Sequence, residues 1–162
     1  MQAHARTRLA GWSGAVLVAA AVLVAAPADA AGGSTAQRHP RCETVDATGS
    51  GQDLGGSRTE ATLSVAGVPV ATSAATFTIG AVDGTVAGFT GPIMLTPLKG
   101  PGTLTAQVAG TFDLASGAFR ATSTSLSGTG PLKKVTGALT FAGVEDFGDG
   151  SFTETVTGQV CR

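Results

Sequence analysis

The residue best placed to do chemistry is Glu154, in a Thr-rich stretch near the C-terminus that predicts a β-strand. Because side chains alternate between the two faces of a strand, Glu154 shares its face with mostly apolar residues. That face holds Phe152, Glu154, Val156, Gly158 and Val160. A carboxyl group among apolar side chains is hard to ionise, which suits a general acid or a polar anchor for a ligand. A one-residue bulge would instead turn Glu154 to solvent.

Glu43 is the second candidate carboxylate, and it lies on the side of Val45 and Ala47 in the first predicted strand. If Glu43 and Glu154 both point inward, two carboxylates face one cavity and perturb each other's pKa. The alternative is a frayed strand end, which would leave Glu43 in solvent.

Cys42 and Cys161 are the only cysteines, and both fall on the polar faces of strands at opposite ends of the folded region. In an eight-stranded antiparallel barrel the first strand pairs with the last, so a cross-strand disulfide is predicted. In an oxidising compartment, closing a loop of about 120 residues stabilises the fold by ~4 kcal/mol. A redox-active or metal-binding pair is the alternative, but it needs low-pKa or clustered thiols.

Other familiar chemistries lack their residues. His39 precedes the folded region, so a Ser-His-Asp or Cys-His mechanism has no base there, and metal clusters lack ligands. Gly49-Ser50-Gly51 misses the dinucleotide-binding spacing and is interpreted as a turn at a strand end. We therefore expect no metal and no organic cofactor.

Charge and aromatic content restrict the partners. Ten Lys and Arg against eleven Asp and Glu give a formal net charge of −1, so neither nucleic acid nor an anionic membrane is an expected partner. Tyr is absent and the one Trp is Trp12, which disfavours carbohydrate-binding and adhesin functions. Lys133-Lys134 would attract an anionic ligand if they rimmed a cavity mouth; otherwise they are a solvated turn. The sequence does not indicate an oligomeric state.

An all-β fold must position these residues. From Cys42 onward the chain is rich in Thr, Val, Ala, Ser and Gly, with turn signals about every eight to fifteen residues and no helical period. This composition is typical of a sandwich or barrel. Eight strands are predicted, at residues 43–50, 59–66, 70–79, 85–95, 103–114, 118–127, 135–144 and 151–161.

Alternation within these strands assigns an interior. Leu104, Val108 and Phe112 share one side of their strand, opposite a polar side. Inward-facing Gly137 and Gly143 suit either a tightly curved sheet or an interior with room for a ligand. Five phenylalanines are predicted to line a dry cavity that binds an apolar small molecule: Phe77, Phe89, Phe112, Phe119 and Phe141.

The turns of the C-terminal half carry a family likeness. Ser127-Gly128-Thr129-Gly130-Pro131-Leu132, Thr136-Gly137, Asp146 and Gly148-Asp149-Gly150 stand in order before the final strand. This arrangement resembles the dirigent and allene oxide cyclase barrels over roughly the last sixty residues. The resemblance implies a closed, calycin-type, eight-stranded antiparallel barrel with an apolar central cavity open at one end. Members use that cavity, without a cofactor, to cyclise an unstable oxide, orient radical coupling or fold polyenes. The acidic and basic residues inside plant dirigent cavities have no one-for-one match here.

The N-terminal segment predicts export. Arg6 and Arg8 precede a short apolar run at 15–26, and Ala28-Asp29-Ala30 fits the small-residue rule before a cleavage site. The run is too short for a membrane span, which needs roughly twenty residues. We therefore expect a signal peptide at 1–30 cleaved near Ala30, a flexible lead-in at 31–41, one barrel domain at 42–162, and secretion.

Three functions are compatible with these features. The first is a secreted barrel that binds an apolar small molecule. The second is a cofactor-free cyclase or isomerase in which Glu154 assists proton transfer. The third is a non-catalytic structural domain whose interior is filled.

Overall fold

A computed structural model describes residues 41–162; the predicted signal peptide and all of the lead-in except Arg41 lie outside this range. The described chain forms nine strands and one short 3₁₀ turn, η1 (Gly130–Leu132). The strands are β1 (Cys42–Asp53), β2 (Arg58–Val65), β3 (Val68–Thr76), β4 (Thr78–Asp83), β5 (Val86–Pro97), β6 (Leu104–Asp113), β7 (Ala118–Gly128), β8 (Thr136–Glu145) and β9 (Ser151–Cys161). No helix among these residues is long and apolar enough to cross a membrane.

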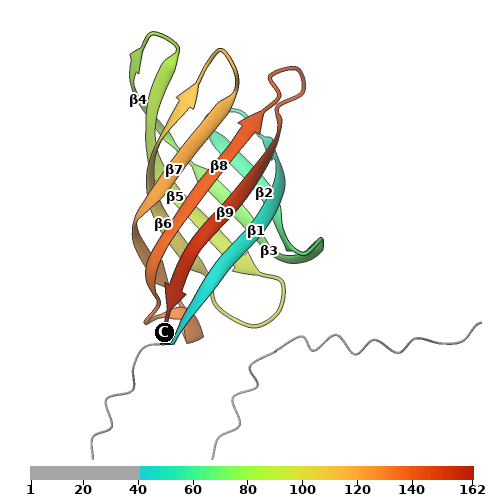
Figure 1. The fold of residues 1–162 in the computed structure, drawn as a ribbon, viewed down its shortest axis with the longest axis vertical. Coiled ribbons are helices and arrows are strands. Elements are labelled where there is room, and N and C mark those ends of the chain that lie inside the picture. The colour runs from blue at the N-terminus through green and yellow to red at the C-terminus, as the bar shows by residue number, and fades with distance from the viewer. Residues whose placement is uncertain (1–40) are drawn as a thin grey trace, which may run out of the picture. The chain divides into compact units, whose positions relative to one another are not determined.

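The strands close into an eight-stranded antiparallel barrel with β4 as one extra strand, which confirms the predicted fold class (Figure 1). Neighbours follow the order β3-β2-β1-β9-β8-β7-β6-β5-β4, and an additional pairing of β3 with β5 closes the ring. The first and last strands pair along eleven consecutive positions without a register shift, from Cys42 opposite Cys161 to Gln52 opposite Ser151. Closure leaves the eight barrel strands without an open edge.

The strand predicted at 70–79 is wrong in one respect, because the structure divides this segment into β3 and β4. β3 pairs with the second half of β5 and β4 with its first half, so the two act as one bent strand. The bend lies at Phe77, whose backbone N–H donates to the carbonyl of Ser57 at 2.8 Å. Opposite it, Pro92 has no N–H to offer, and a side chain at Gly91 would collide with the backbone of Thr76.

The interpretation of Gly49-Ser50-Gly51 as a turn is also wrong, because β1 continues through these residues to Asp53. Both glycines lie on the inner face and make room for side chains of β9. A Cβ at Gly49 would lie 2.7 Å from Cγ of Glu154, and one at Gly51 would overlap the ring of Phe152. These glycines therefore act as spacers within a strand.

Inward glycines on β8 and β9 serve curvature. A Cβ at Gly137 would lie only 2.0 Å from the carbonyl oxygen of Gln159, and one at Gly158 only 2.1 Å from that of Ala138. At Gly143 it would meet the carbonyl of Thr153 and the ring of Phe119. The sequence left two interpretations of these inward glycines, a tightly curved sheet or room for a ligand. These distances favour the curved sheet, in which neighbouring backbones approach closely.

The interior is packed in the half of the barrel that holds the two cysteines. Buried aliphatic side chains fill it, led by Leu139 and Val156, each 1 % exposed. Leu104, Ala106, Val108 and Val135 join the same cluster. This half ends at the β7–β8 connection, where η1 and Leu132 close the barrel. The lower half of the molecule in Figure 1 is therefore a filled barrel.

The predicted disulfide joins Cys42 and Cys161, which are directly opposed on β1 and β9. Both residues occupy outward positions on their strands, as the alternation predicted. The flanking Arg41 and Arg162 form a hydrogen-bonded pair, with backbone bonds of 2.9 and 2.8 Å. Hydrogen-bonded and non-hydrogen-bonded pairs alternate along an antiparallel ladder, so Cys42 and Cys161 form a non-hydrogen-bonded pair, in which the two residues are closer together. The bond spans 119 residues, so it links the two ends of the barrel chain. A disulfide is consistent with an extracellular protein.

Replacing both cysteines with serine is expected to lower the free energy of unfolding by about 4 kcal/mol while leaving a folded barrel. The loss arises because the unfolded chain regains the freedom that a long closed loop denies it. Urea denaturation followed by far-UV circular dichroism measures the difference, with the reduced wild-type protein as the matched comparison. A loss below about 1 kcal/mol would contradict the expectation.

Candidate functional site

The opposite half of the barrel holds a cavity of about 380 Å³. It opens at the end formed by the β1–β2, β4–β5, β6–β7 and β8–β9 turns, at the top of Figure 1. Phe141 is 1 % exposed, lines the cavity and also belongs to the packed core, so its ring separates the open half from the filled one. The barrel interior is thus filled at one end and hollow at the other.

One wall of the cavity is aromatic. All five phenylalanines selected from the sequence line it, together with Phe147 and Phe152. Phe77 and Phe89 meet edge to face at 5.0 Å between ring centroids, and Phe119 meets Phe152 in the same way at 6.0 Å. Phe147 is 54 % exposed and packs edge to face on Phe112 at the mouth. These contacts fix the rings in place, so the wall is largely preformed.

Glu154 points into this cavity. β9 pairs with β1 and β8 without a register shift, so the bulge that would turn Glu154 outward is absent from this strand. On both neighbouring strands its cross-strand partner is a glycine, Gly49 on β1 and Gly143 on β8. The side chain lies across Gly49 beside Leu63. Burial there raises the pKa of Glu154 to about 7.

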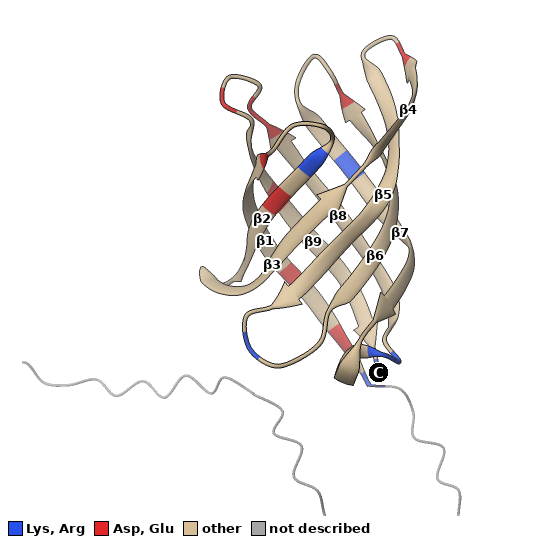
Figure 2. Ribbon diagram, turned by 180° about the vertical axis from the view of Figure 1, so that it is seen from behind, with Lys and Arg blue, Asp and Glu red and all other residues tan. Residues whose placement is uncertain are grey.

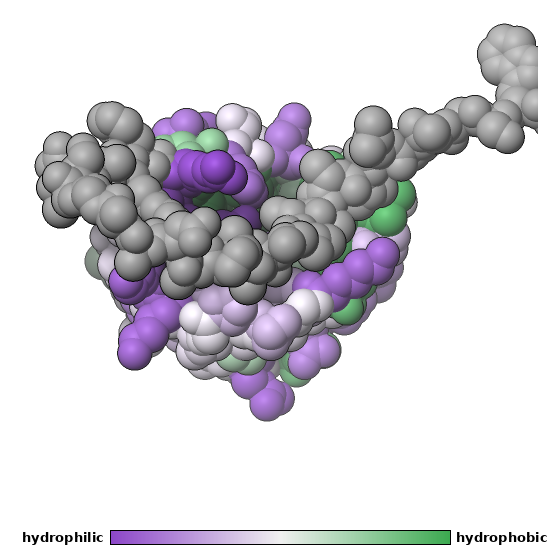
Figure 3. Space-filling model, turned by 90° about the horizontal axis from the view of Figure 1, so that it is seen from below, coloured by the Kyte–Doolittle hydropathy of each residue, from purple (hydrophilic) through white to green (hydrophobic). Residues whose placement is uncertain are grey.

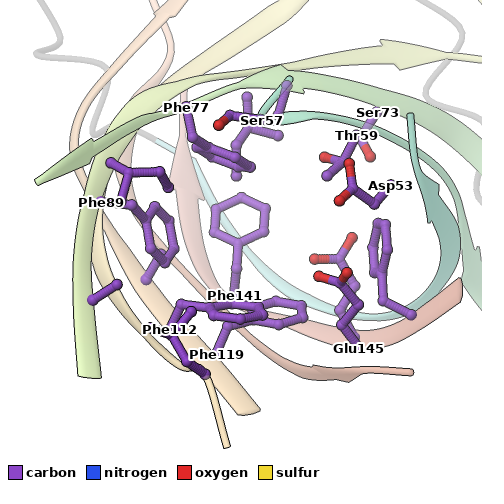
Figure 4. Close-up of a pocket in the computed structure, with 18 of the residues that line it drawn as sticks. Asp53, Ser57, Thr59, Ser73, Phe77, Phe89, Phe112, Phe119, Phe141 and Glu145 are labelled. Carbon is purple, nitrogen blue, oxygen red and sulfur yellow. The ribbon is translucent and has the colours of Figure 1, made fainter. Parts of the chain in front are cut away.

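Two further carboxylates share the wall with Glu154, and the sequence analysis missed both. Glu145 ends β8 and Asp53 ends β1, and Figure 4 shows them facing each other across from the phenylalanines. Burial and the nearby charge of Asp53 raise the pKa of Glu145. Alternation from Phe141 through Gly143 predicts an inward Glu145. The same argument finds Asp53 only when β1 is allowed to continue through its glycines.

Hydroxyl groups complete the polar wall. Thr59 on β2 and Ser73 on β3 lie beside Asp53 in Figure 4, and Ser57, in the turn that precedes β2, lies beside Phe77. Asp53 is engaged locally, because its Oδ1 accepts a 2.8 Å hydrogen bond from the backbone N–H of Gly55. Among the described residues, Glu145 and Glu154 accept no hydrogen bond and form no ion pair. The cavity therefore has one apolar face and one face that offers acceptors.

Glu43 does not join this site. It lies at the other end of β1, opposite Val160, whereas Glu154 lies opposite Gly49. Its carboxylate is exposed and pairs with the guanidinium of Arg162 at 3.4 Å. The hypothesis that Glu43 and Glu154 face one cavity is therefore wrong. Glu43 lies six residues along β1 from Gly49, the residue opposite Glu154. Glu43 is in solvent, as the alternative predicted, but the strand end is not frayed, because Glu43 lies opposite Val160 in the β1–β9 ladder.

Lys133 and Lys134 also lie away from the mouth, in the β7–β8 connection at the closed end. Figure 2 shows most of the acidic segments toward the open end, although red segments also lie in the other half and blue segments lie on strands of the open half. Where described side chains are visible, the closed end is mainly hydrophilic with scattered apolar atoms (Figure 3). The lysine pair is thus the solvated turn of the sequence analysis rather than the rim of a cavity.

Within residues 41–162, no three His, Cys, Asp or Glu side chains come close enough together to hold a metal ion. No family model, curated protein or solved structure matches the chain. The fold and the cavity alone define the class: a small closed antiparallel β-barrel with a one-ended internal cavity. The dirigent and allene oxide cyclase resemblance stays a prediction from the turn motifs.

Titration of Glu154 is expected to make stability depend on pH. Between pH 4.5, its ordinary pKa, and about 7, the folded protein keeps a proton that the unfolded chain releases. The free energy of unfolding therefore falls as pH rises through this interval, by up to about 3 kcal/mol. Glu145, whose pKa is also raised, changes the free energy of unfolding in the same direction. Hydrogen bonds in the turns lower the pKa values of Asp113 and Asp149, so these two groups titrate below this pH interval.

Urea denaturation between pH 4.5 and 8 tests this for wild type and for Glu154→Gln, with exposed Glu60→Gln as the matched control. In Glu154→Gln the free energy of unfolding should fall much less as pH rises, whereas in Glu60→Gln it should fall as it does in wild type. Carbon-13 NMR of labelled glutamate carboxyls locates the midpoint directly. A Glu154 midpoint near 4.5 would contradict the assignment.

Proposed function

We propose that this protein is a secreted barrel that binds an apolar small molecule in its open half. The observation that carries the proposal is a cavity of about 380 Å³ whose lining includes seven phenylalanines. This size lies within the range of roughly 300–1,000 Å³ that is usual for small-molecule sites, and such sites combine apolar walls with a few polar groups. A purely structural barrel gains nothing from leaving half of its interior unfilled.

Export supports this proposal. The basic residues, short apolar run and small-residue cleavage pattern at 1–30 are those of a signal peptide. The Cys42–Cys161 disulfide suits an oxidising compartment. A protein that acts outside the cell on a poorly soluble compound benefits from a closed, covalently linked barrel around a preformed cavity.

Filling the cavity is expected to abolish binding of a neutral apolar probe. N-phenyl-1-naphthylamine gains fluorescence in apolar surroundings, and residues 41–162 contain no Trp or Tyr to interfere. Ala75 is buried and lines the cavity on β3, so Ala75→Leu should weaken binding at least about tenfold. Ala74→Leu places the same change on the outer face of β3 and should leave affinity unchanged. Failure of wild type to bind the probe, or equal binding by both variants, would overturn the proposal.

Acid-base catalysis is the second candidate, and the position of Glu154 favours it. A carboxyl group whose pKa is near 7, inside an apolar cavity, exchanges protons readily at neutral pH. The surrounding walls would hold a substrate in one conformation, as a cyclase or isomerase requires. This candidate adds turnover to binding at the same site.

A proton-transfer probe tests whether Glu154 acts as a base. In 5-nitrobenzisoxazole a base removes the ring C–H proton while the N–O bond breaks, and the coloured nitrophenolate product is followed by absorbance. The rate should rise with pH through about 7 and fall at least about tenfold in Glu154→Gln. Glu60→Gln should match wild type. A rate independent of Glu154 would remove the catalytic candidate while leaving the binding proposal intact.

A further inference from the structure

The two walls of the cavity differ in chemistry, and the difference restricts the ligand. Phe77, Phe89, Phe112, Phe119 and Phe141 form one side, and the carboxylates of Asp53 and Glu145 stand on the other (Figure 4). Glu154 and Phe152 on β9 also line the cavity. A ligand that fills this space lies with an apolar body against the rings and one end against the carboxylates. The cavity therefore selects an amphiphilic molecule with its polar group at one end.

The sign of charge at that polar end follows from what lines the cavity. Among the described residues, no Lys, Arg or His side chain lines it. Arg58 and Arg120, the basic residues in this half, occupy exposed outward positions on β2 and β7. Nothing in the cavity neutralises its carboxylates, so an anionic ligand meets like charges at short range.

The turns around the mouth extend the same field. Asp83, Asp113, Asp146 and Asp149 all lie at the turns of the open end, because β4 ends at Asp83, β6 ends at Asp113 and the other two lie between β8 and β9. Figure 2 shows red segments around this end. Asp113 accepts a hydrogen bond from the backbone N–H of Ala115, and Asp149 from that of Ser151, each at 2.8 Å. These bonds favour the ionised forms. An approaching cation is thus drawn toward the mouth before it enters.

We propose that the ligand is an apolar primary or secondary amine, bound as its ammonium ion with the nitrogen between Glu145 and Asp53, which face each other in Figure 4. The carboxylates supply acceptors for charge-assisted hydrogen bonds, and the hydroxyls of Thr59 and Ser73, which lie beside Asp53 in Figure 4, supply further acceptors. This inference rests on the proposed binding function and names the ligand class for that same cavity.

The ammonium ion also solves a problem of the free protein. Glu145 and Glu154 sit in the cavity wall without a hydrogen bond or an ion pair to another described residue, and Glu154 is largely buried. Two such carboxyls are costly to hold in the ionised form. A cation seated between Glu145 and Asp53 favours the ionised form of Glu145, so binding should release protons and strengthen as pH rises from 5 to 8. Glu154 is the other ionisable group that lines the cavity.

Three probes that differ only at one end test the proposal by isothermal titration calorimetry with the mature protein. They are 4-phenylbutylamine, 4-phenylbutanol and 4-phenylbutanoate. At pH 8 the amine should bind at least about tenfold more tightly than the alcohol, and the alcohol more tightly than the acid. Glu154→Gln and Glu145→Gln should each reduce this preference, and Glu60→Gln, on the outer face of β2, should keep it.

The outcomes separate the two proposals. Preference for the amine that grows with pH and is lost in the cavity variants supports the ammonium site. Equal or tighter binding of the alcohol, or preference for the acid, overturns it while leaving apolar binding intact. Binding of none of the three, together with failure of the neutral fluorescent probe, overturns both. The comparison among probes uses wild-type protein, so it stands even if one variant folds poorly.

Discussion

Pairing of the first strand with the last is the constraint on which the rest of this structure depends. The β1–β9 ladder runs for eleven residue pairs in a single register. That register closes the barrel, places Cys42 beside Cys161 outside it, and places Gly49 beside Glu154 inside it. A slip of one residue would exchange the two faces of β9, moving Glu154 to solvent and turning Cys161 to the interior, away from Cys42. The site and the covalent link therefore depend on the same alignment.

Alternation of polar and apolar residues was sufficient to predict most of this fold. It located eight strands, assigned the inner phenylalanines and placed both cysteines outside. Alternation failed where glycine occupies an inner position of a strand. Gly49 and Gly51 suggested a turn because a glycine has no side chain to mark a face, and their role is visible only once Glu154 and Phe152 lie across them. Ending β1 early then concealed Asp53.

Long-range arrangement accounts for the other errors. Glu43 and Glu154 both face inward in the local pattern, but antiparallel pairing of β1 with β9 sends them to opposite ends of the barrel. The same pairing decides which turns surround the mouth of the cavity. The alternation of residues within one strand does not show which strand it pairs with. Phe77 illustrates a further limit: the break between β3 and β4 comes from Gly91 and Pro92 on β5, across the sheet.

The division of the interior reflects two competing demands. Aliphatic side chains pack the end that holds the disulfide, where nearly complete burial of Leu139 and Val156 supplies much of the stabilising apolar contact. The other end keeps a hollow and retains carboxylates that burial makes costly to ionise. Tolerating such groups is common at binding and catalytic sites, which give up stability for recognition. The closed, cross-linked ladder of β1 and β9 supplies the rigidity that lets the open end depart from good packing, and it is also the ladder that holds Glu154 against the cavity.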